Sequence, residues 1–327
     1  MELGLLMGEE RTAPEEIRLA ARAEEAGVRR IWFGEHVLIK DSLVMTALAL
    51  SATKGAVVGP CAVNPWTRNA AVLMASISTL YSMYPGRLEL SIAPGEEVLV
   101  NFGISMKGSL RAMEETITAL RRLMRLEVVD MDGEHVKMKR ALVTGFREEI
   151  RVPVYLAAMG LRMLRLAGAV ADGAVINFLA PEGYIREAIE SIKEGLLASG
   201  RRGFRVFQLI AASSEDDEDG LRRARMFIAK FYRLSPDFYR KYMGDGWVVD
   251  EVIRRVELPF SDEQLERAAE VIPEEHVRRL MAFGSPEDVL RQVEDQTERW
   301  GSIPVLYVLD RDPINLLKYV AEGLSGG

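Results

Sequence analysis

The sequence predicts a single parallel (β/α)8 barrel, and two observations carry that prediction. Stretches with strand character alternate with amphipathic helical stretches about eight times along the 327 residues, which is the pattern of a parallel sheet covered by helices. No Gly-x-Gly-x-x-Gly follows the first strand-like stretch, which disfavours a dinucleotide-binding open sheet. A doubly wound open sheet is the structural alternative. We therefore treat residues 1–327 as one domain.

The predicted strands are short, rich in apolar or β-branched residues, and mostly followed by Gly, Pro or a polar residue. They lie at 3–7, 30–34, 56–58, 87–92, 152–157, 173–177, 204–211 and 303–309.

Helical stretches lie between these strands. Thr12 and Glu15 have the spacing of a capping box at the start of the first helix, and Gly27 closes that helix. Over 110–124, apolar residues recur every three or four positions, which predicts one buried helical face. The helices are therefore expected to pack on the outside of the sheet.

Two stretches interrupt the alternation. Residues 127–139 alternate around Asp132-Gly133 and predict a hairpin insertion. Residues 213–283 begin with an acidic run and continue with helical stretches that carry seven aromatic side chains between Phe227 and Trp247. Such an aromatic stripe is more typical of core or interface packing than of a cofactor site. The second stretch is therefore predicted to be a late helical insertion.

Composition excludes several classes of function. The net charge is −7 without a long basic run, which argues against nucleic-acid binding. No apolar run approaches the roughly 18 residues of a membrane span, so a cytoplasmic protein that does not enter the membrane is expected. Cys61 is the single cysteine, which leaves no internal disulfide and no Cys-based zinc site. The three histidines lie far apart in sequence, and no metal site is predicted.

Polar or irregular residues follow five consecutive predicted strands, where barrels carry their active sites. After the third strand, Gly59 and Pro60 break the strand pattern, because proline lacks a ladder donor. The five segments are Glu35-His36, 59–64, Pro94-Gly95-Glu96, 158–160 and Asn177. The alternative interpretation of each segment is an ordinary loop between a strand and a helix.

Three of these segments suggest a chemical role. Glu35 and His36 are candidates for a proton-transfer pair, because a carboxylate tunes a neighbouring imidazole. Glu96 could donate a proton or hydrogen bond to a bound ring, or it could be a helix-start carboxylate. Gly160 could open a helix whose free N–H groups bind a phosphate, or it could be a plain helix start.

Four ordered motifs resemble the luciferase-like flavin and deazaflavin oxidoreductases. They are Gly-Pro-Cys-Ala-Val-Asn-Pro at 59–65, Leu-Ser-Ile-Ala-Pro-Gly-Glu at 90–96, Val-Pro-Val-Tyr-Leu-Ala-Ala-Met-Gly at 152–160 and Ala-Asp-Gly-Ala-Val-Ile-Asn at 171–177. Within that superfamily the chain is most similar to the archaeal coenzyme F420-dependent methylenetetrahydromethanopterin reductases. The resemblance spans nearly the whole chain.

The resemblance implies a barrel that holds the deazaflavin of coenzyme F420 at its carboxyl mouth. It also implies a non-prolyl cis peptide at Cys61-Ala62, forming a bulge behind the ring. The predicted site has His36 and Glu96 as catalytic residues. Its cofactor-binding residues are Glu35, Gly59, Pro60, Cys61, Ala62, Asn64, Gly95, Ala158, Met159, Gly160 and Asn177.

Some positions depart from the reductase pattern. Leu6 stands where these reductases carry a first-strand glutamate, and Val63 replaces their usual threonine. The leading hypothesis is an F420-dependent oxidoreductase acting on a small-molecule substrate, for which a tetrahydromethanopterin-type pterin is one candidate. An FMN-dependent luciferase-like monooxygenase and a non-catalytic flavin-binding homologue are the alternatives. The family also implies a homodimer or homotetramer.

Overall fold

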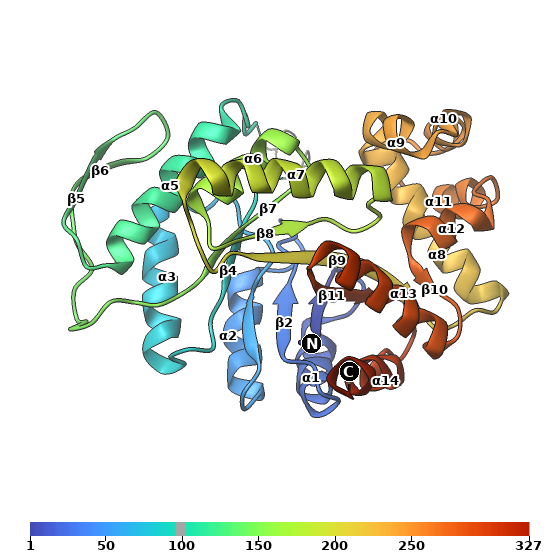
Figure 1. Ribbon diagram of the computed structural model, residues 1–327, viewed down its shortest axis with the longest axis horizontal. Helices are drawn as coiled ribbons and strands as arrows, with labels where there is room; N and C mark the ends of the chain where they lie inside the picture. Colours follow the sequence, from blue (N-terminus) through green and yellow to red (C-terminus); the bar gives the residue numbers. More distant parts are fainter. Residues whose placement is uncertain (96–102, 327) are drawn as a thin grey trace.

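The computed structural model describes residues 1–95 and 103–326, and its centre is a parallel sheet (Figure 1). Eight strands follow one another around this sheet in the order β3-β2-β1-β11-β9-β8-β7-β4. Their bounds are β1 Gly4–Met7, β2 Arg30–Phe33, β3 Val57–Pro60, β4 Leu90–Ile92, β7 Val154–Ala158, β8 Gly173–Ile176, β9 Arg205–Ser213 and β11 Ile303–Val308.

The sheet closes between β3 and β4. Parallel bridges join Val58 to Leu88 and Val63 to Ile92 across this seam. Gly59 allows the close approach, because a Cβ at this position would lie 2.2 Å from the carbonyl oxygen of Glu89. The predicted barrel class is therefore confirmed, and Gly59 has a packing role in closing it.

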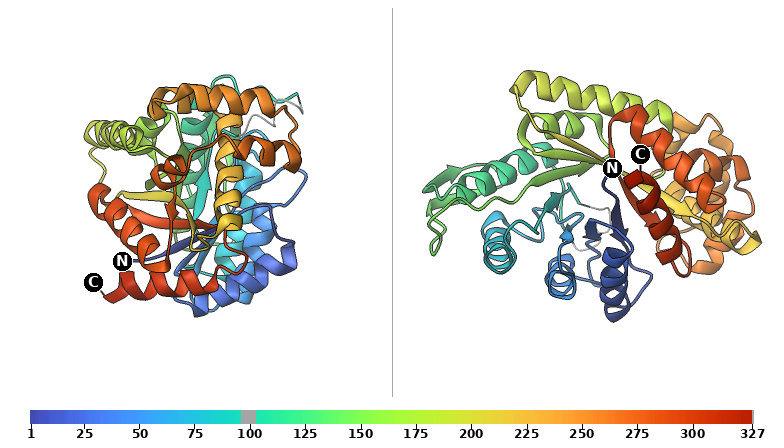
Figure 2. Two further views of the ribbon diagram at one scale, coloured as in Figure 1. Left: turned by 90° about the vertical axis from the view of Figure 1, so that its right-hand side faces the viewer. Right: turned by 60° about the horizontal axis from the view of Figure 1, so that its bottom comes forward.

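Helices cover the outside of the barrel, as the alternation predicted. They are α1 Ala13–Glu25, α2 Ser42–Ala52, α3 Ala70–Met83, α5 Ser109–Met124, α6 Leu161–Val170, α7 Glu182–Ser199, α13 Pro286–Trp300 and α14 Ile314–Gly326. In both views of Figure 2 the first strand and the end of α14 lie close together, so the two ends of the described chain meet at one side. None of the helices within the described ranges is long and apolar enough to cross a membrane.

The two interrupting stretches form separate structures at opposite sides of the molecule (Figure 1). Strands β5 (Val129–Asp132) and β6 (Lys137–Ala141) pair in an antiparallel hairpin. The later stretch contains a short strand that pairs with the end of β9 and five helices. These elements are α8 Glu218–Leu234, α9 Pro236–Met243, α10 Gly246–Arg255, α11 Asp262–Ala269, α12 Glu274–Leu280 and β10 Ala282–Phe283. The treatment of the whole chain as one domain stays a prediction.

The structure differs from the prediction at the end of the third strand. Gly59 and Pro60 lie within β3, where Pro60 is the register partner of Phe33 in β2. The amide of Val57 donates to Arg29 O, just before β2, and the amide of Cys61 donates to Phe33 O in β2. In a parallel ladder, successive backbone N–H groups point alternately to the two neighbouring strands. The backbone nitrogen of residue 60 therefore faces away from β2, and a proline there removes no bond to β2.

A buried ion pair fills the amino end of the barrel. The carboxylate of Glu89 accepts two bonds from the Arg30 guanidinium, at 2.6 and 2.9 Å. It also accepts bonds from Trp32 Nε1 at 3.2 Å and Tyr155 Oη at 2.8 Å. Burial, followed by the Glu89 charge, raises the pKa of Tyr155. These buried side chains therefore form a structural plug that fills the amino end of the barrel and leaves no open site there.

Glu115 joins α5 to the turn of the hairpin. Its carboxylate accepts the backbone amides of Glu134, His135 and Val136 at 2.8–3.0 Å. Burial alone would raise the pKa of Glu115, but the three amide bonds and Arg111 outweigh it and lower the pKa to about 2. The ionised carboxylate is therefore the form that holds the hairpin.

Replacing Glu115 by glutamine is expected to lower the free energy of unfolding at pH 7 by on the order of 2 kcal/mol. Because the folded-state pKa lies below the ordinary 4.5, this contribution is complete above about pH 4.5 and is lost as pH falls towards 2. Urea titrations at several pH values measure the difference. Glu114→Gln, which removes an exposed partner of Arg111, is the control and should change stability little at any pH.

Candidate active site

Five strand ends form one continuous arc of the barrel mouth. The order of the sheet and the bridges at its seam place β2, β3, β4, β7 and β8 next to one another. Parallel strands end on the same edge, so the segments predicted from these strands lie along a single rim. The structure therefore brings the described residues of the five predicted segments to one end of the barrel.

Glu35 anchors the start of α2. Its carboxylate accepts the amide of Ser42 at 2.8 Å and the Ser42 hydroxyl, and it receives Arg68 Nε at 3.0 Å. Arg68 also pairs with Asp41 at 2.6 Å. The prediction that Glu35 pairs with His36 for proton transfer is therefore wrong for Glu35. Its carboxylate instead binds the start of α2 and Arg68.

His36 has a different acidic neighbour. Its Nδ1 lies 3.6 Å from Oε2 of Glu9, which follows β1, and the other Glu9 oxygen accepts the ammonium of Lys230 from α8. The imidazole folds back over the end of β2, since a Cβ on Gly34 would lie 2.5 Å from His36 Nε2. Burial raises the pKa of Glu9, but Lys230 and, more weakly, His36 and Lys40 bring it below the ordinary value. Glu9 is thus an ionised carboxylate between two basic groups.

The chain after β3 continues along the rim beside β4. The Cys61-Ala62 peptide is cis, as predicted. The segment then rejoins β4, because Val63 N donates to Ser91 O at 3.1 Å and Ala93 N donates to Val63 O at 2.9 Å. Burial raises the pKa of the Cys61 thiol to about 12, so at neutral pH this cysteine is a neutral packing group.

Asn64 is buried and stabilises the next turn. Its Oδ1 accepts the amides of Trp66 at 3.1 Å and Thr67 at 2.9 Å. Trp66 Nε1 in turn donates to Pro94 O at 2.6 Å, which ties this turn to the loop after β4. Gly95 has a positive φ of 106°, where glycine is favoured. Glu96, the second predicted catalytic residue, lies outside the described residues.

The loop after β7 leads directly into α6. Ala158 is the last residue of β7, and the carbonyl of Met159 accepts Tyr184 Oη at 2.9 Å. Gly160 is the N-cap of α6, and no side chain caps its free amides. A Cβ on Gly160 would meet no atom within 4 Å. The amino end of α6 is therefore open to an anion.

Asn177 and an aromatic cluster complete the arc. Asn177 follows β8, and its Oδ1 accepts the amide of Phe178 at 3.0 Å. The Phe178 ring lies 4.8 Å from Phe231, 5.4 Å from Phe227 and 5.5 Å from Tyr307, measured between centroids. Two of these rings come from α8. The helical stretch thus supplies an apolar aromatic wall beside the rim.

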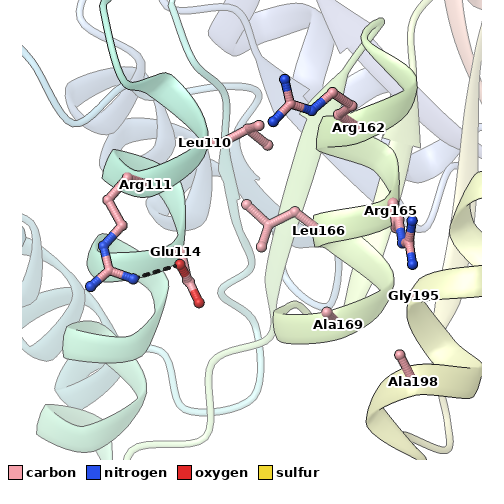
Figure 3. Close-up of a pocket in the computed structure, with 9 residues that line it drawn as sticks. All are labelled: Leu110, Arg111, Glu114, Arg162, Arg165, Leu166, Ala169, Gly195 and Ala198. Carbon is pink, nitrogen blue, oxygen red and sulfur yellow. Dashed lines mark hydrogen bonds and ion pairs between the residues drawn. The ribbon is translucent and has the colours of Figure 1, made fainter.

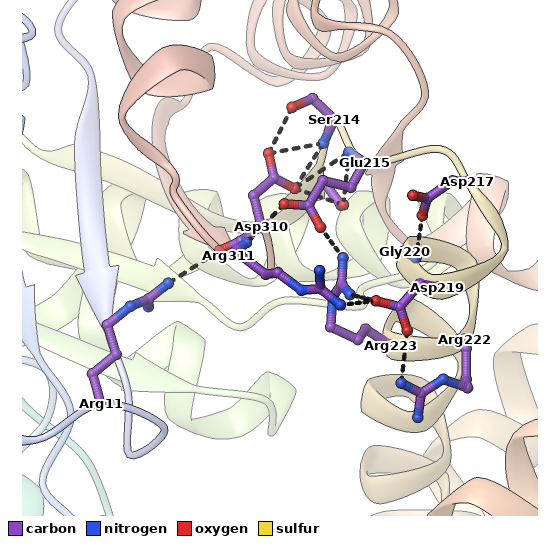
Figure 4. Close-up of polar contacts among 11 residues, drawn as sticks. Arg11, Ser214, Glu215, Asp217, Asp219, Gly220, Arg222, Arg223, Asp310 and Arg311 are labelled. Atoms are coloured by element: carbon purple, nitrogen blue, oxygen red, sulfur yellow. Dashed lines mark hydrogen bonds and ion pairs between the residues drawn. The ribbon is translucent and has the colours of Figure 1, made fainter.

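Figure 4 shows how the opposite part of the rim is closed. Asp310, which follows β11, accepts Ser213 Oγ at 2.7 Å, Ser214 N at 2.9 Å and Ser214 Oγ at 2.6 Å. Asp219 in α8 pairs with Arg223 at 2.6 Å and with Arg311. These contacts fasten the loops after β9 and β11 to the start of α8. Internal polar groups therefore occupy this part of the rim.

A cavity of about 450 Å³ lies outside the barrel, between α5, α6 and α7 (Figure 3). Its lining is mostly aliphatic, and its charged groups are largely paired, with Arg111 3.0 Å from Glu114 and Arg165 3.5 Å from Glu194. It contains no group suited to redox or proton chemistry at the barrel mouth. We therefore place the candidate active site at the five-strand rim.

The sequence-based prediction did not include several residues of the candidate active site. Glu9 and Glu10 follow β1 after Gly8, so the rule applied to the other strand ends would have identified them. Phe227 and Phe231 belong to the aromatic stripe that was interpreted as packing, and they do pack against each other at 5.0 Å. Lys230 gave no local signal, because its partner Glu9 is 221 residues away in sequence.

Comparison with known proteins gives matches along most of the chain. The family model described as luciferase-like monooxygenase matches residues 2–302. A 5,10-methylenetetrahydromethanopterin reductase of Methanolobus tindarius is 33% identical over 226 residues, covering 67% of each chain. An F420-dependent glucose-6-phosphate dehydrogenase of Mycolicibacterium smegmatis is 26% identical over 322 residues, covering 92% of this chain and 90% of the relative.

Solved structures show the same fold. The coenzyme F420-dependent tetrahydromethanopterin reductase of Methanopyrus kandleri superposes with a TM-score of 0.88 at 21% identity, covering 98% of this chain and 97% of that one. An F420-dependent secondary alcohol dehydrogenase in complex with an F420-acetone adduct gives a TM-score of 0.80 at 19% identity, covering 99% and 98%. At these identities the likeness concerns the fold alone.

Proposed function

Because this chain belongs to the luciferase-like monooxygenase family, we propose that it is a coenzyme F420-dependent oxidoreductase. It transfers a hydride between the deazaflavin and an electrophilic carbon of a small substrate. The observation that carries the proposal is that His36, the Cys61-Ala62 segment and the uncapped amino end of α6 follow strands β2, β3 and β7 on the same rim. Relatives that act with F420 and match this chain over nearly its full length support the choice of cofactor.

The residues present fit a flat ring with an anionic tail. The uncapped amides of α6 and the empty space before Gly160 suit the phosphate of such a tail. The backbone at Cys61-Ala62 lies at the rim between β2 and β4, where a ring face could rest on it. When bound, the cofactor supplies the hydride-accepting or hydride-donating carbon.

Side chains of the protein carry out the remaining chemistry. A carbon that gains or loses a hydride at a C–O or C–N bond also requires a proton at the heteroatom, and His36 is the group placed to hold it. The aromatic wall of Phe178, Phe231 and Tyr307 keeps water from one side of the site. Glu35 keeps its proposed cofactor-binding role indirectly, by fixing the start of α2 beside the rim.

The substrate class is less closely defined than the cofactor. Relatives act on a one-carbon pterin and on a sugar phosphate, as their names state. Leu6 in β1 is apolar and buried. It stands where the pterin reductases carry a first-strand glutamate, so another residue must supply the proton in this protein. A tetrahydromethanopterin-type pterin is our first candidate substrate. The family description names monooxygenases, so the FMN-dependent monooxygenase of the sequence analysis is the second candidate function.

A titration tests the cofactor. Under anaerobic conditions the protein is expected to bind F420 at least about tenfold more tightly than FMN. Gly160→Glu places a carboxylate at the open end of α6 and should weaken F420 binding by about tenfold or more, which corresponds to about 1.4 kcal/mol. Ala198→Glu, which adds the same charge far along α7, is the control and should bind normally. Equal or tighter binding of FMN would favour the monooxygenase.

The oligomeric state is also proposed here. Neither α2 nor α3 contains a charged residue, although 28% of the chain is charged. Val44, Leu48 and Val72 are 56%, 48% and 53% exposed on these helices. Such an apolar face suits a homodimer interface. Light scattering is expected to show a dimer for the native chain and a monomer for Val44→Asp combined with Val72→Asp. A native monomer would contradict this proposal.

A further inference from the structure

We propose that Tyr307 is a substrate-selecting residue, whose hydroxyl group donates its proton to Glu10 and accepts a hydrogen bond from an O–H or N–H group of the substrate. The site would then favour an alcohol, a sugar or an N–H-bearing ring over a molecule that carries acceptors alone. This inference rests on the proposed function, because it concerns the substrate of that same site. It goes beyond the place of the Tyr307 ring in the aromatic wall.

Tyr307 lies near the carboxyl end of β11 and points into the barrel. It packs in the buried cluster that contains Trp32 of the barrel interior, whereas its neighbours Leu306 and Val308 pack with the outer layer of helices. The Tyr307 ring stacks on Phe227 of α8, with 5.1 Å between centroids and 20° between planes. Tyr307 is 7% exposed, so its ring is held firmly at the mouth.

The Tyr307 hydroxyl reaches the segment that follows β1. A Cβ on Gly8 would lie 2.3 Å from Tyr307 Oη, so the glycine leaves room for the hydroxyl. β1 pairs with β2 on one side and with β11 on the other, and His36 follows β2. His36 and Tyr307 thus flank the end of β1, where Leu6 packs in the same cluster as Tyr307. A substrate held there has the imidazole on one side and the hydroxyl on the other.

Glu10 decides which way the hydroxyl proton points. Tyr307 Oη donates to Oε1 of Glu10, and an ionised carboxylate can only accept. Burial, and then the charge of Glu10, raises the pKa of the Tyr307 hydroxyl, so the phenol keeps its one proton for this bond. The hydroxyl oxygen retains lone pairs for a second partner, and donation to a charged acceptor makes that oxygen a stronger acceptor. The group that it fits is therefore a donor.

The basic groups at this end of β1 are bound to other partners. Lys40 donates to the carbonyl of Gly8 at 2.7 Å. Lys230 donates to Glu9. None of the residues that the structure describes donates a hydrogen bond to Tyr307 Oη. Because a largely buried acceptor gains free energy when it receives a donor, a substrate with an O–H or N–H group beside the reacting carbon is favoured.

The direct test compares two ligands of similar shape, cyclohexanol and cyclohexanone, with the protein free of cofactor. The alcohol offers an O–H donor, whereas the ketone can only accept. Ligand-detected NMR titrations give the two dissociation constants. Tyr307→Phe keeps the ring on Phe227 and removes the hydroxyl, so it should weaken cyclohexanol binding by about tenfold and leave cyclohexanone binding unchanged.

Two further variants separate hydrogen bonding from packing. Tyr242→Phe removes a hydroxyl that donates to Glu187 at 2.7 Å, a bond of the same kind between α9 and α7, and should bind both ligands normally. Glu10→Ala frees the Tyr307 proton to point into the site, so cyclohexanone should bind about threefold more tightly or better. A purely structural role for the bond between Glu10 and Tyr307 would not strengthen the binding of any ligand.

The inference is overturned if Tyr307→Phe weakens both ligands equally, if it weakens the ketone alone, or if the native protein binds neither ligand. Because Glu10 is exposed, the Glu10→Ala variant should fold and give a decisive result even if Tyr307→Phe does not. The titrations are repeated with reduced F420 for the alcohol and oxidised F420 for the ketone, so that no hydride transfer can occur, and the same order is expected. Correct selection between the ligands without any binding of F420 would contradict the proposed function alone.

Discussion

Hydride transfer by the His36→Ala variant is expected to be about 10²- to 10⁴-fold slower than by the native protein, which is the usual contribution of a general acid or base. The affinity for F420 should change little, because the imidazole acts on charge that develops during the reaction. Anaerobic single-turnover kinetics measure the rate, and a fluorescence titration measures the affinity.

Two comparisons make the His36 result specific. His135 belongs to the turn of the hairpin and packs its ring against Trp66 at 5.4 Å, so His135→Gln should retain the native rate. His36→Gln keeps a polar side chain of similar size but cannot accept and release a proton. If His36→Gln matched the native rate, His36 would be a packing residue.

Glu89→Ala is expected to have the largest effect on stability, lowering the free energy of unfolding by about 3–5 kcal/mol. The substitution leaves Arg30 without its buried counter-ion. It also removes the acceptor of Trp32 Nε1 and Tyr155 Oη, and buried donors without partners are costly. Urea unfolding followed by far-UV circular dichroism gives the free energy.

Glu2→Gln is the matched control for Glu89. Glu2 also pairs with Arg30, at 3.0 Å, but its side chain is 59% exposed. Removing that charge should cost no more than about 1 kcal/mol. Similar losses in the two variants would show that the buried plug at the amino end of the barrel contributes no more than an ordinary surface pair.

The arrangement of the rim could be predicted because it follows from chain direction alone. Once the strands are parallel, every segment that follows a strand lies at the same end of the barrel. The strand alternation was sufficient to predict the fold class. The cis peptide at Cys61-Ala62 was implied by the family resemblance of the motifs, and the helix start at Gly160 was expected with or without a phosphate.

The direction of individual side chains could not be predicted in the same way. Glu35 and His36 are neighbours in sequence, yet Glu35 reaches Ser42 while His36 folds back over Gly34. Pro60 stays within β3 because its missing donor faces away from β2, which depends on the register. The pairing of Glu9 with Lys230 depends on how α8 packs on the barrel mouth, and it cannot be predicted from the sequence spacing of the two residues.

The most direct test of the proposed activity is an anaerobic single turnover with reduced F420 that carries deuterium at C5. The protein is mixed with this cofactor and, in separate reactions, with a methylene-pterin, a ketone and a sugar lactone. One of these substrates is expected to reoxidise the cofactor, and deuterium is expected at the reduced carbon of the product. The proposed activity would be contradicted if none of them reoxidised the cofactor while reduced FMN and oxygen supported a protein-dependent oxygenation.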